Sequence, residues 1–191
     1  MRKTMLRLAL LAVVVVFAVT ACGPKATPAP TAVATEPPVG FTIPEIESGK
    51  FNVAIVLIGF HLDGGWSQAH LFGAQWMTTQ DPNIAVQYVE LVFPGPDAES
   101  VMRSLARKGF DLIIGTTLEY GPTMETLAAE FPNINFLHVS GYRSNGTNYG
   151  NLMGAMEDMK YLAGMVAGAR AVADGNTKLG YVAPWPVPEV I

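Results

Sequence analysis

The sequence of 191 residues is poor in the patterns that covalent or metal chemistry needs. Cys22 is its only cysteine, which excludes an internal disulfide framework and a metal site with several cysteine ligands. The three histidines, His61, His70 and His138, have no second ligand at metal spacing. The chain also lacks the Gly-x-Ser-x-Gly elbow, the phosphate loop and the Gly-x-Gly-x-x-Gly fingerprint. We therefore expect a protein that is not an enzyme and holds no metal or cofactor.

Basic charge is also scarce. Only 15% of the residues are charged, and the formal net charge is −4. Without the first 21 residues, which include Arg2, Lys3 and Arg7, nine basic and sixteen acidic side chains remain, a net charge of −7. Nucleic acids bind to surfaces rich in Lys and Arg because their phosphates are negative. The acidic remainder therefore argues against a nucleic-acid partner.

The first 22 residues have the order of a secretory signal peptide. After the basic start, the apolar run Leu8–Val19 is too short to span a bilayer comfortably. Val19-Thr-Ala-Cys22 then resembles the bacterial lipobox, in which an aliphatic residue and two small residues precede a cysteine. The resemblance implies that residues 1–21 are removed and that Cys22 is lipidated. It also implies a cell-membrane protein, held by its lipid at the extracytoplasmic face.

Residues 22–48 are predicted to be a disordered tether. Six prolines stand among alanines and threonines, which favours an extended chain and leaves too few apolar side chains for a core. We expect a ligand-binding lobe over residues 49–176. Residues 177–191 are expected to hold the crossover and the first strand of a second lobe that is largely missing.

Apolar strands and amphipathic helices alternate from Phe51 onward. Short apolar runs indicate buried strands, and the segments between them carry apolar residues at helical spacing. Strands are expected at 51–58, 84–92, 110–116, 134–139, 148–153 and 178–183, and helices at 67–79, 96–108, 122–131 and 157–174. This alternation predicts an α/β lobe whose parallel sheet is covered by helices on both faces.

Each of these four helices is expected to bury a stripe of apolar side chains. In the second helix, which Pro96 opens and Gly109 closes, the stripe is Val101, Met102, Leu105 and Ala106, and in the third it is Met124, Leu127, Ala128 and Phe131. In the first helix the stripe is Phe72, Trp76 and Met77. In the longest helix it is Tyr161, Leu162, Met165, Val166 and Ala169.

The turns at the carboxyl ends of the strands are the expected ligand site. In the first of them, Asp63, Gly64, Gly65 and Trp66 stand just before a helix. Glycine lets a ligand approach the backbone, an indole can stack on a planar heterocycle, and a carboxylate can accept hydrogen bonds. A tight Asp-Gly-Gly turn beside a core tryptophan would give the same residues. This pattern alone leaves both interpretations open.

Five segments in register resemble the basic-membrane-protein (PnrA-like) family of substrate-binding lipoproteins of ABC importers. They are Asp63–His70, Phe110–Thr117, Ala129–Asn133, Tyr161–Gly168 and Leu179–Glu189. The resemblance covers residues 51–191 and implies a lobe of the periplasmic-binding-protein type I fold. In that fold two α/β lobes close on a purine base or nucleoside and dock on ABC permease subunits.

The resemblance also implies which residues meet the ligand. Asp63, Trp66 and Ser67 occupy the family's aspartate, stacking aromatic and polar positions, with Gly64 and Gly65 in place of Lys-Ser. These changes are similar to a Gly-Gly-Trp branch of the family and favour a purine base over a ribose-bearing ligand. With the aromatic edge residues Phe60 and Tyr142 included, the expected ligand contacts are Phe60, Asp63, Gly65, Trp66, Ser67, Thr116, Thr117, Glu119, Tyr120, Tyr142 and Trp185.

Two other functions stay open. A receptor lipoprotein would sense the ligand without transporting it, and a neighbouring permease gene would distinguish the two. A nucleoside-cleaving enzyme would need a positioned acid or base, for which only Asp63 and Glu119 are available.

Overall fold

The computed structural model describes residues 40–183 and residue 186. The predicted signal peptide, Cys22, most of the predicted tether and Trp185 lie outside these residues. Within the described part, no helix is long and apolar enough to cross a membrane.

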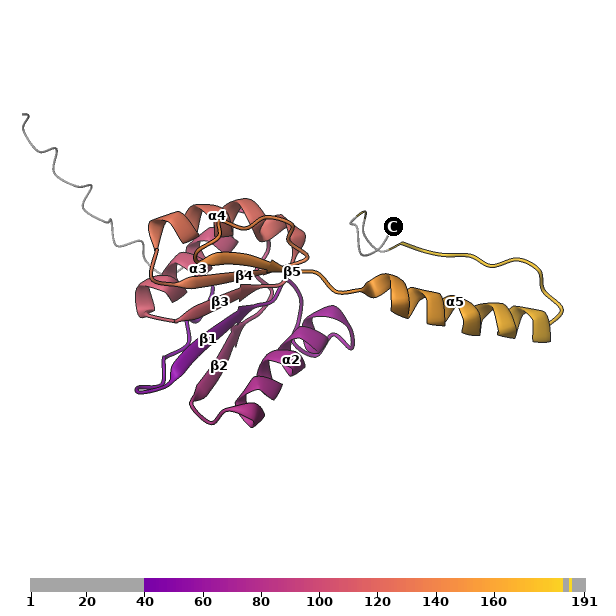
Figure 1. Ribbon diagram of the computed structural model, residues 1–191, viewed down its shortest axis with the longest axis horizontal. Helices are drawn as coiled ribbons and strands as arrows, with labels where there is room; N and C mark the ends of the chain where they lie inside the picture. Colours follow the sequence, from indigo (N-terminus) through magenta and orange to yellow (C-terminus); the bar gives the residue numbers. More distant parts are fainter. Residues whose placement is uncertain (1–39, 184–185, 187–191) are drawn as a thin grey trace, which may run out of the picture. The chain divides into compact units, whose positions relative to one another are not determined.

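Five parallel strands form one sheet in the order β2-β1-β3-β4-β5 (Figure 1). The strands are β1 (Phe51–Val56), β2 (Ile84–Val89), β3 (Leu112–Gly115), β4 (Asn135–Val139) and β5 (Tyr149–Leu152). Strand β1 pairs with both β2 and β3, and five of its six residues are buried. A nearly continuous apolar run is what such a strand requires, because helices cover both of its faces. The predicted parallel α/β sheet is confirmed.

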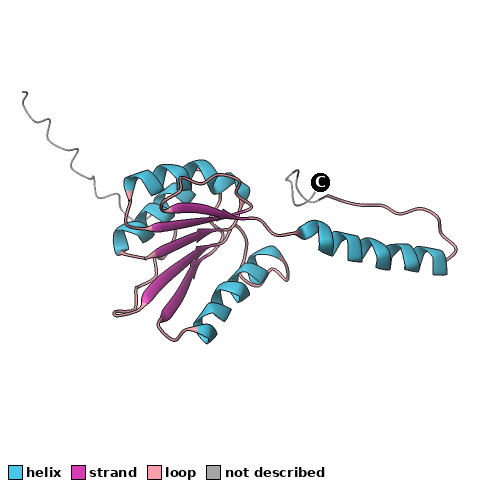
Figure 2. Ribbon diagram, in the orientation of Figure 1, coloured by secondary structure: helices cyan, strands magenta, loops and turns pink. Residues whose placement is uncertain are grey.

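Helices cover the two faces unequally (Figure 2). The helices are α2 (Trp66–Gln80), α3 (Pro96–Lys108), α4 (Gly121–Glu130) and α5 (Met156–Ala173), with a 3-10 turn η1 (Leu118–Tyr120) before α4. Helices α3 and α4 build the larger core cluster with Ala54 and Val56 of β1. Helix α2 builds the smaller cluster with Val53 and Ile55. Because successive strand residues point to opposite faces, α2 lies on one face and α3 and α4 lie on the other.

The first described residues pack on the lobe. Phe41 and Ile43 contact the larger core cluster, and the Lys108 ammonium donates to the Ile43 carbonyl oxygen (3.2 Å) and to Glu45 Oε1 (2.5 Å). The sequence predicts the boundary between tether and lobe at residue 48, so the packed segment begins several residues earlier than predicted. Two apolar side chains are enough to seat residues 41–45 on the lobe, although prolines surround them in the sequence.

Helix α2 does not bury the predicted stripe. Phe72 and Trp76 are 56% and 62% exposed. The side chains that face the sheet are instead Ser67, Leu71, Ala74 and, in part, Met77. The backbone N–H of Gly59 donates to the Ser67 hydroxyl (3.1 Å), which turns this side of the helix toward β1. The prediction that Phe72 and Trp76 are buried was therefore wrong, because α2 is rotated about its axis so that a neighbouring side faces the sheet.

Helix α5 lies within one residue of the predicted bounds at each end but buries none of its residues. Tyr161, Leu162, Met165 and Val166 are 53–72% exposed, and Ala169 is exposed as well, so the predicted inward stripe is wrong. Periodicity predicts an apolar stripe, but burial also requires an element that packs on it.

The strand expected at 178–183 is not formed either, because described residues 176–183 have no strand conformation. The Lys178 N–H donates to the Asn176 side chain (3.0 Å) rather than to a neighbouring strand.

Candidate functional site

The order in which strands are added to the sheet switches sides at β1, although all strands stay parallel. Strand β2 lies on one side of β1, and β3 lies on the other. The loop that follows β1 and the loop that follows β3 therefore meet at the carboxyl edge of neighbouring strands. Open α/β sheets bind their ligands at this point.

Trp66 joins these two loops. Its indole Nε1 donates a hydrogen bond to the Thr116 carbonyl oxygen (2.6 Å), fifty residues away. One turn along α2, the His70 ring packs at 4.4 Å from the indole, and its Nδ1 donates to the Trp66 carbonyl oxygen (2.6 Å). The Trp66 side chain is thus held at its edge and from the helix side, yet the residue remains 39% exposed. It forms a fixed aromatic surface at the edge where ligands gather.

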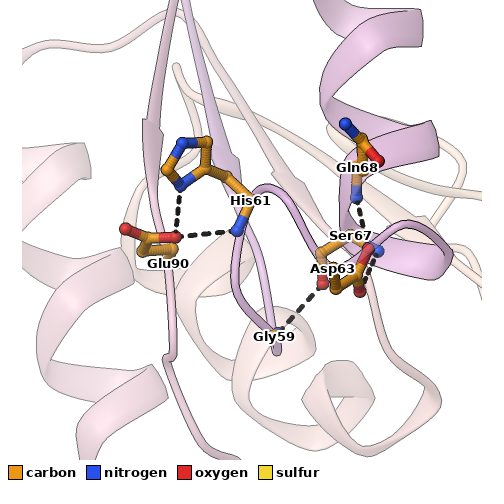
Figure 3. Close-up of polar contacts among 6 residues, drawn as sticks. All are labelled: Gly59, His61, Asp63, Ser67, Gln68 and Glu90. Carbon is orange, nitrogen blue, oxygen red and sulfur yellow. Dashed lines mark hydrogen bonds and ion pairs between the residues drawn. The ribbon is translucent and has the colours of Figure 1, made fainter.

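Asp63 caps the start of α2 (Figure 3). Its Oδ1 accepts from the backbone N–H groups of Gly65 (2.8 Å) and Gln68 (3.1 Å), and its Oδ2 accepts from that of Ser67 (2.9 Å). The Ser67 N–H is the main cause that lowers the pKa of Asp63 from 3.8 to about 2; burial opposes it, and the Gln68 and Gly65 N–H groups add to it. The contacts thus favour the turn-stabilising role of Asp63, and its contact with a ligand stays a prediction.

A second carboxylate holds the other end of the same loop. Glu90 Oε2 accepts from the backbone N–H and from Nδ1 of His61, both at 2.7 Å (Figure 3). Burial alone would raise the pKa of Glu90, but the His61 hydrogen bonds and charge outweigh it and lower the pKa. His61 also packs between the rings of Phe60 and Tyr88. Glu90 therefore anchors the segment that presents the half-exposed Phe60.

Three of the expected ligand residues belong to the interior of the lobe. The Ser67 hydroxyl accepts from Gly59, and the Thr116 hydroxyl donates to the Val56 carbonyl oxygen (2.8 Å). The Tyr120 hydroxyl donates to the Val92 carbonyl oxygen, and burial, followed by the Glu119 charge, raises the pKa of Tyr120. These buried side chains support the loops that follow β1 and β3 from the interior of the lobe. Their contact with a ligand stays a prediction.

His138 was missed as a site residue. It is 2% exposed at the end of β4, where Nε2 donates to the Thr117 carbonyl oxygen (2.8 Å) and Nδ1 bonds to the Tyr149 hydroxyl (3.1 Å). A Cβ atom added to Gly121 or Gly141 would lie within 3.0 Å of this ring, so both positions require glycine. A polar residue near the end of an apolar strand was the only signal for His138 in the sequence.

Glu119 and Tyr142, both expected ligand residues, line one pocket of about 360 Å³. The Thr117 hydroxyl donates a hydrogen bond to the Glu119 carboxylate.

Gly65 is exposed at the start of α2. In the part of the chain that the structure describes, no group of three His, Cys, Asp or Glu side chains is placed to hold a metal ion.

Comparison with known families gives a match over almost all of the lobe. The model of the PnrA-like ABC transporter substrate-binding proteins matches residues 50–190. A Haloferax volcanii protein, named as a candidate ABC transporter glucose-binding protein, is 38% identical over 76% of this chain and 36% of its own. A purine-binding protein of Brucella abortus is 29% identical over 74% of this chain and 40% of its own. The chain thus spans less than half the length of these relatives.

Solved structures agree on the fold. An ABC transporter solute-binding protein from Conexibacter woesei matches 61% of this chain and 39% of its own, with 27% identity and a TM-score of 0.52. A second solute-binding protein, from Aeropyrum pernix, matches 66% of this chain and 35% of its own at 18% identity, with a TM-score of 0.55.

Proposed function

Because the chain belongs to the PnrA-like family of ABC transporter substrate-binding proteins, we propose that it binds a purine base or nucleoside for import by an ABC permease. The proposed mechanism is binding without covalent chemistry. The ligand rests on this lobe, a second lobe closes over it, and the closed form docks on the permease.

The fixed position of Trp66 carries the proposal of a planar ligand. The indole is bonded to Thr116, backed by His70, and partly exposed at the point where open α/β sheets bind ligands. A surface that is already in place loses little conformational freedom on binding, so stacking contributes more of its energy to affinity. The name of the Brucella abortus relative supports a purine as that planar ligand.

We further propose that Cys22 anchors the protein by a lipid to the extracytoplasmic face of a membrane. The support is the basic, apolar, small-residue and cysteine order of residues 1–22. Sensing without transport is the alternative that shares every feature of the site. Loss of purine uptake on deletion of the gene would support transport over sensing.

The substitution Trp66→Ala tests the proposed function. Loss of a base–aromatic stack removes about 1–3 kcal/mol, so we expect the Kd for adenine to rise about 5- to 150-fold. Trp66→Phe should keep most of the affinity because a flat ring remains. Both are measured by calorimetry, with D-glucose titrated in parallel because the Haloferax volcanii relative bears that name.

Trp76→Ala is the matched control. Trp76 lies on the same helix and is 62% exposed, but it takes no part in the edge where the loops meet. Its removal should leave the adenine Kd unchanged. Equal binding of adenine by the wild type and by Trp66→Ala would refute the stacking role of Trp66. No binding of any purine base or nucleoside by the wild type would refute the proposed function.

A further inference from the structure

The pocket of about 360 Å³ is separate from the Trp66 surface. It lies between the start of α4 and the loop that joins β4 to β5, and its volume is within the range of small-molecule sites, about 300–1,000 Å³. The residues that line it include Glu119, Pro122, His138, Tyr142, Arg143 and Tyr149.

The pocket and Trp66 lie on opposite sides of the sheet. Phe136 of β4 belongs to the core cluster of α3 and α4, and His138 stands two residues further along the strand, so it points to the same face. Trp66 begins α2, which covers the other face. A solute in the pocket would therefore not compete directly for the indole.

Two buried polar side chains, His138 and Tyr149, line the inner end of the pocket and are already ordered. His138 and Tyr149 are 2% and 3% exposed and are bonded to each other. The Thr117 carbonyl oxygen accepts from His138, which ties this wall to the loop that carries Glu119. Ordered polar groups in a mostly apolar wall are typical of sites that orient a small ligand.

The charges near the pocket disfavour an anionic ligand. Arg143 is paired with Glu125 (2.9 Å), and Glu119 adds a second carboxylate. Burial and then the Glu125 charge raise the pKa of Tyr149, while the Arg143 charge lowers it. Phosphate would be repelled because the two carboxylates outnumber the one guanidinium.

Tyr142 supplies an apolar wall at the mouth. It is 70% exposed, and the Arg143 guanidinium lies 5.4 Å from the centre of its ring. An aromatic ring can cover the C–H face of a sugar, and a carboxylate beside it can accept the bonds of neighbouring hydroxyls.

We propose that this pocket is a second binding site, which takes a neutral solute with several hydroxyl groups, such as a sugar ring, and rejects its phosphate ester. Glu119 accepts the hydroxyl bonds, Tyr142 covers the apolar face, and the wall of His138 and Tyr149 sets the depth. This proposal assigns Glu119 and Tyr142, which were predicted above as purine contacts, to the second solute. The site works without Trp66, so its occupancy can be tested separately from purine stacking on the indole.

Saturation-transfer NMR with D-glucose tests the site on the purified protein. We expect the wild type to show transfer, and Tyr142→Ala and Glu119→Gln to weaken glucose binding about tenfold or more, the loss that one charge-assisted hydrogen bond represents. Glucose 6-phosphate should bind at least about tenfold more weakly than glucose, and Glu125→Gln should narrow that gap because one repelling carboxylate is lost.

Tyr161→Ala and Trp66→Ala are the controls. Tyr161, at 71% exposure on α5, matches Tyr142 in kind and accessibility, and its loss should leave glucose binding unchanged. Trp66→Ala should also keep glucose binding while adenine binding falls. The site is refuted if the wild type binds no glucose, if Tyr142→Ala binds it equally well, or if Trp66→Ala abolishes it. Because Tyr142 is exposed, its variant keeps the test valid even if Glu119→Gln does not fold.

Discussion

Asp63 illustrates how one carboxylate can hold the first turn of a helix in place. Its three hydrogen bonds from backbone N–H groups occupy both oxygens and fix the first turn of α2, in which Trp66 is the first residue. His70 then supports the indole from one turn further along. Trp66 is thus an exposed residue of this edge, and Asp63 and His70 hold it in position.

Asp63→Asn is expected to destabilise the lobe by about 1 kcal/mol, the usual cost of a lost helix cap, because the amide nitrogen cannot accept a bond. The measurement is thermal unfolding of the ligand-free protein. Asp97→Asn is the matched control, since Asp97 lies in the first turn of α3, where no side-chain cap bond is formed. It loses only its interaction with the helix dipole, so it should lower the melting temperature less than Asp63→Asn. A melting temperature equal to the wild type's, together with weaker adenine binding, would instead make Asp63 a ligand residue.

The same substitution predicts a pH dependence. The folded-state pKa of Asp63, about 2, lies below its ordinary value of 3.8. The stabilisation is therefore complete above the ordinary value and is lost as the pH falls from 3.8 toward 2. The difference in melting temperature between the wild type and Asp63→Asn should shrink over this range and be constant at neutral pH.

At the scale of elements, the ends of α3 show local sequence control. Pro96 stands in its first turn, Asp97 and Glu99 are acidic there, and Arg107 and Lys108 are basic in the last turn. Both charge groups complement the helix dipole. Gly109 then ends the helix with φ at 97°, and its N–H donates to the carbonyl oxygens of Ala106 and Leu105.

Gly109→Ala should therefore destabilise the lobe by about 1–2 kcal/mol, because the left-handed conformation is strained for a residue with a Cβ. The nearest atom to that Cβ is Ile46 Cδ1 at 3.9 Å, so the effect comes from the backbone and not from a clash. Thermal unfolding measures it. Gly164→Ala on α5, where a Cβ meets open space, is the control and should not lower the melting temperature. Equal effects of both substitutions would contradict this explanation.

At the scale of the whole molecule, the proposed anchor decides where the binding lobe works. We expect Cys22→Ser to move the protein from the membrane fraction to the soluble fraction, because the serine cannot take the lipid. Fractionation with intact-mass analysis measures this. Thr20→Ser keeps a small residue before the cysteine and should remain in the membrane. A wild-type protein that is soluble and begins at a residue other than Cys22 would contradict the anchor.

The sequence by itself determined the succession of strands and helices, the parallel sheet and several helix ends, because these follow from local rules. Apolar runs such as 51–56 and the Pro96 and Gly109 signals act within a few residues of themselves. The stripes of α3 and α4 were also correct, since Val101, Leu105, Met124 and Leu127 are buried. The resemblance of short segments, beginning with Asp63–His70, was enough to place the chain in its family.

Only the tertiary structure decided which sides of the helices face the sheet and which residues meet at its edge. Helical periodicity predicted that Phe72 and Trp76 lie on the buried side of α2. The side that faces the sheet is instead the one that carries Ser67, which is hydrogen-bonded to Gly59. Trp66 reaches Thr116 across fifty residues, and His138 reaches Thr117 across twenty-one. Such contacts form because the packing of the sheet brings together segments that are distant in the sequence. No local sequence pattern indicates which of these segments will meet.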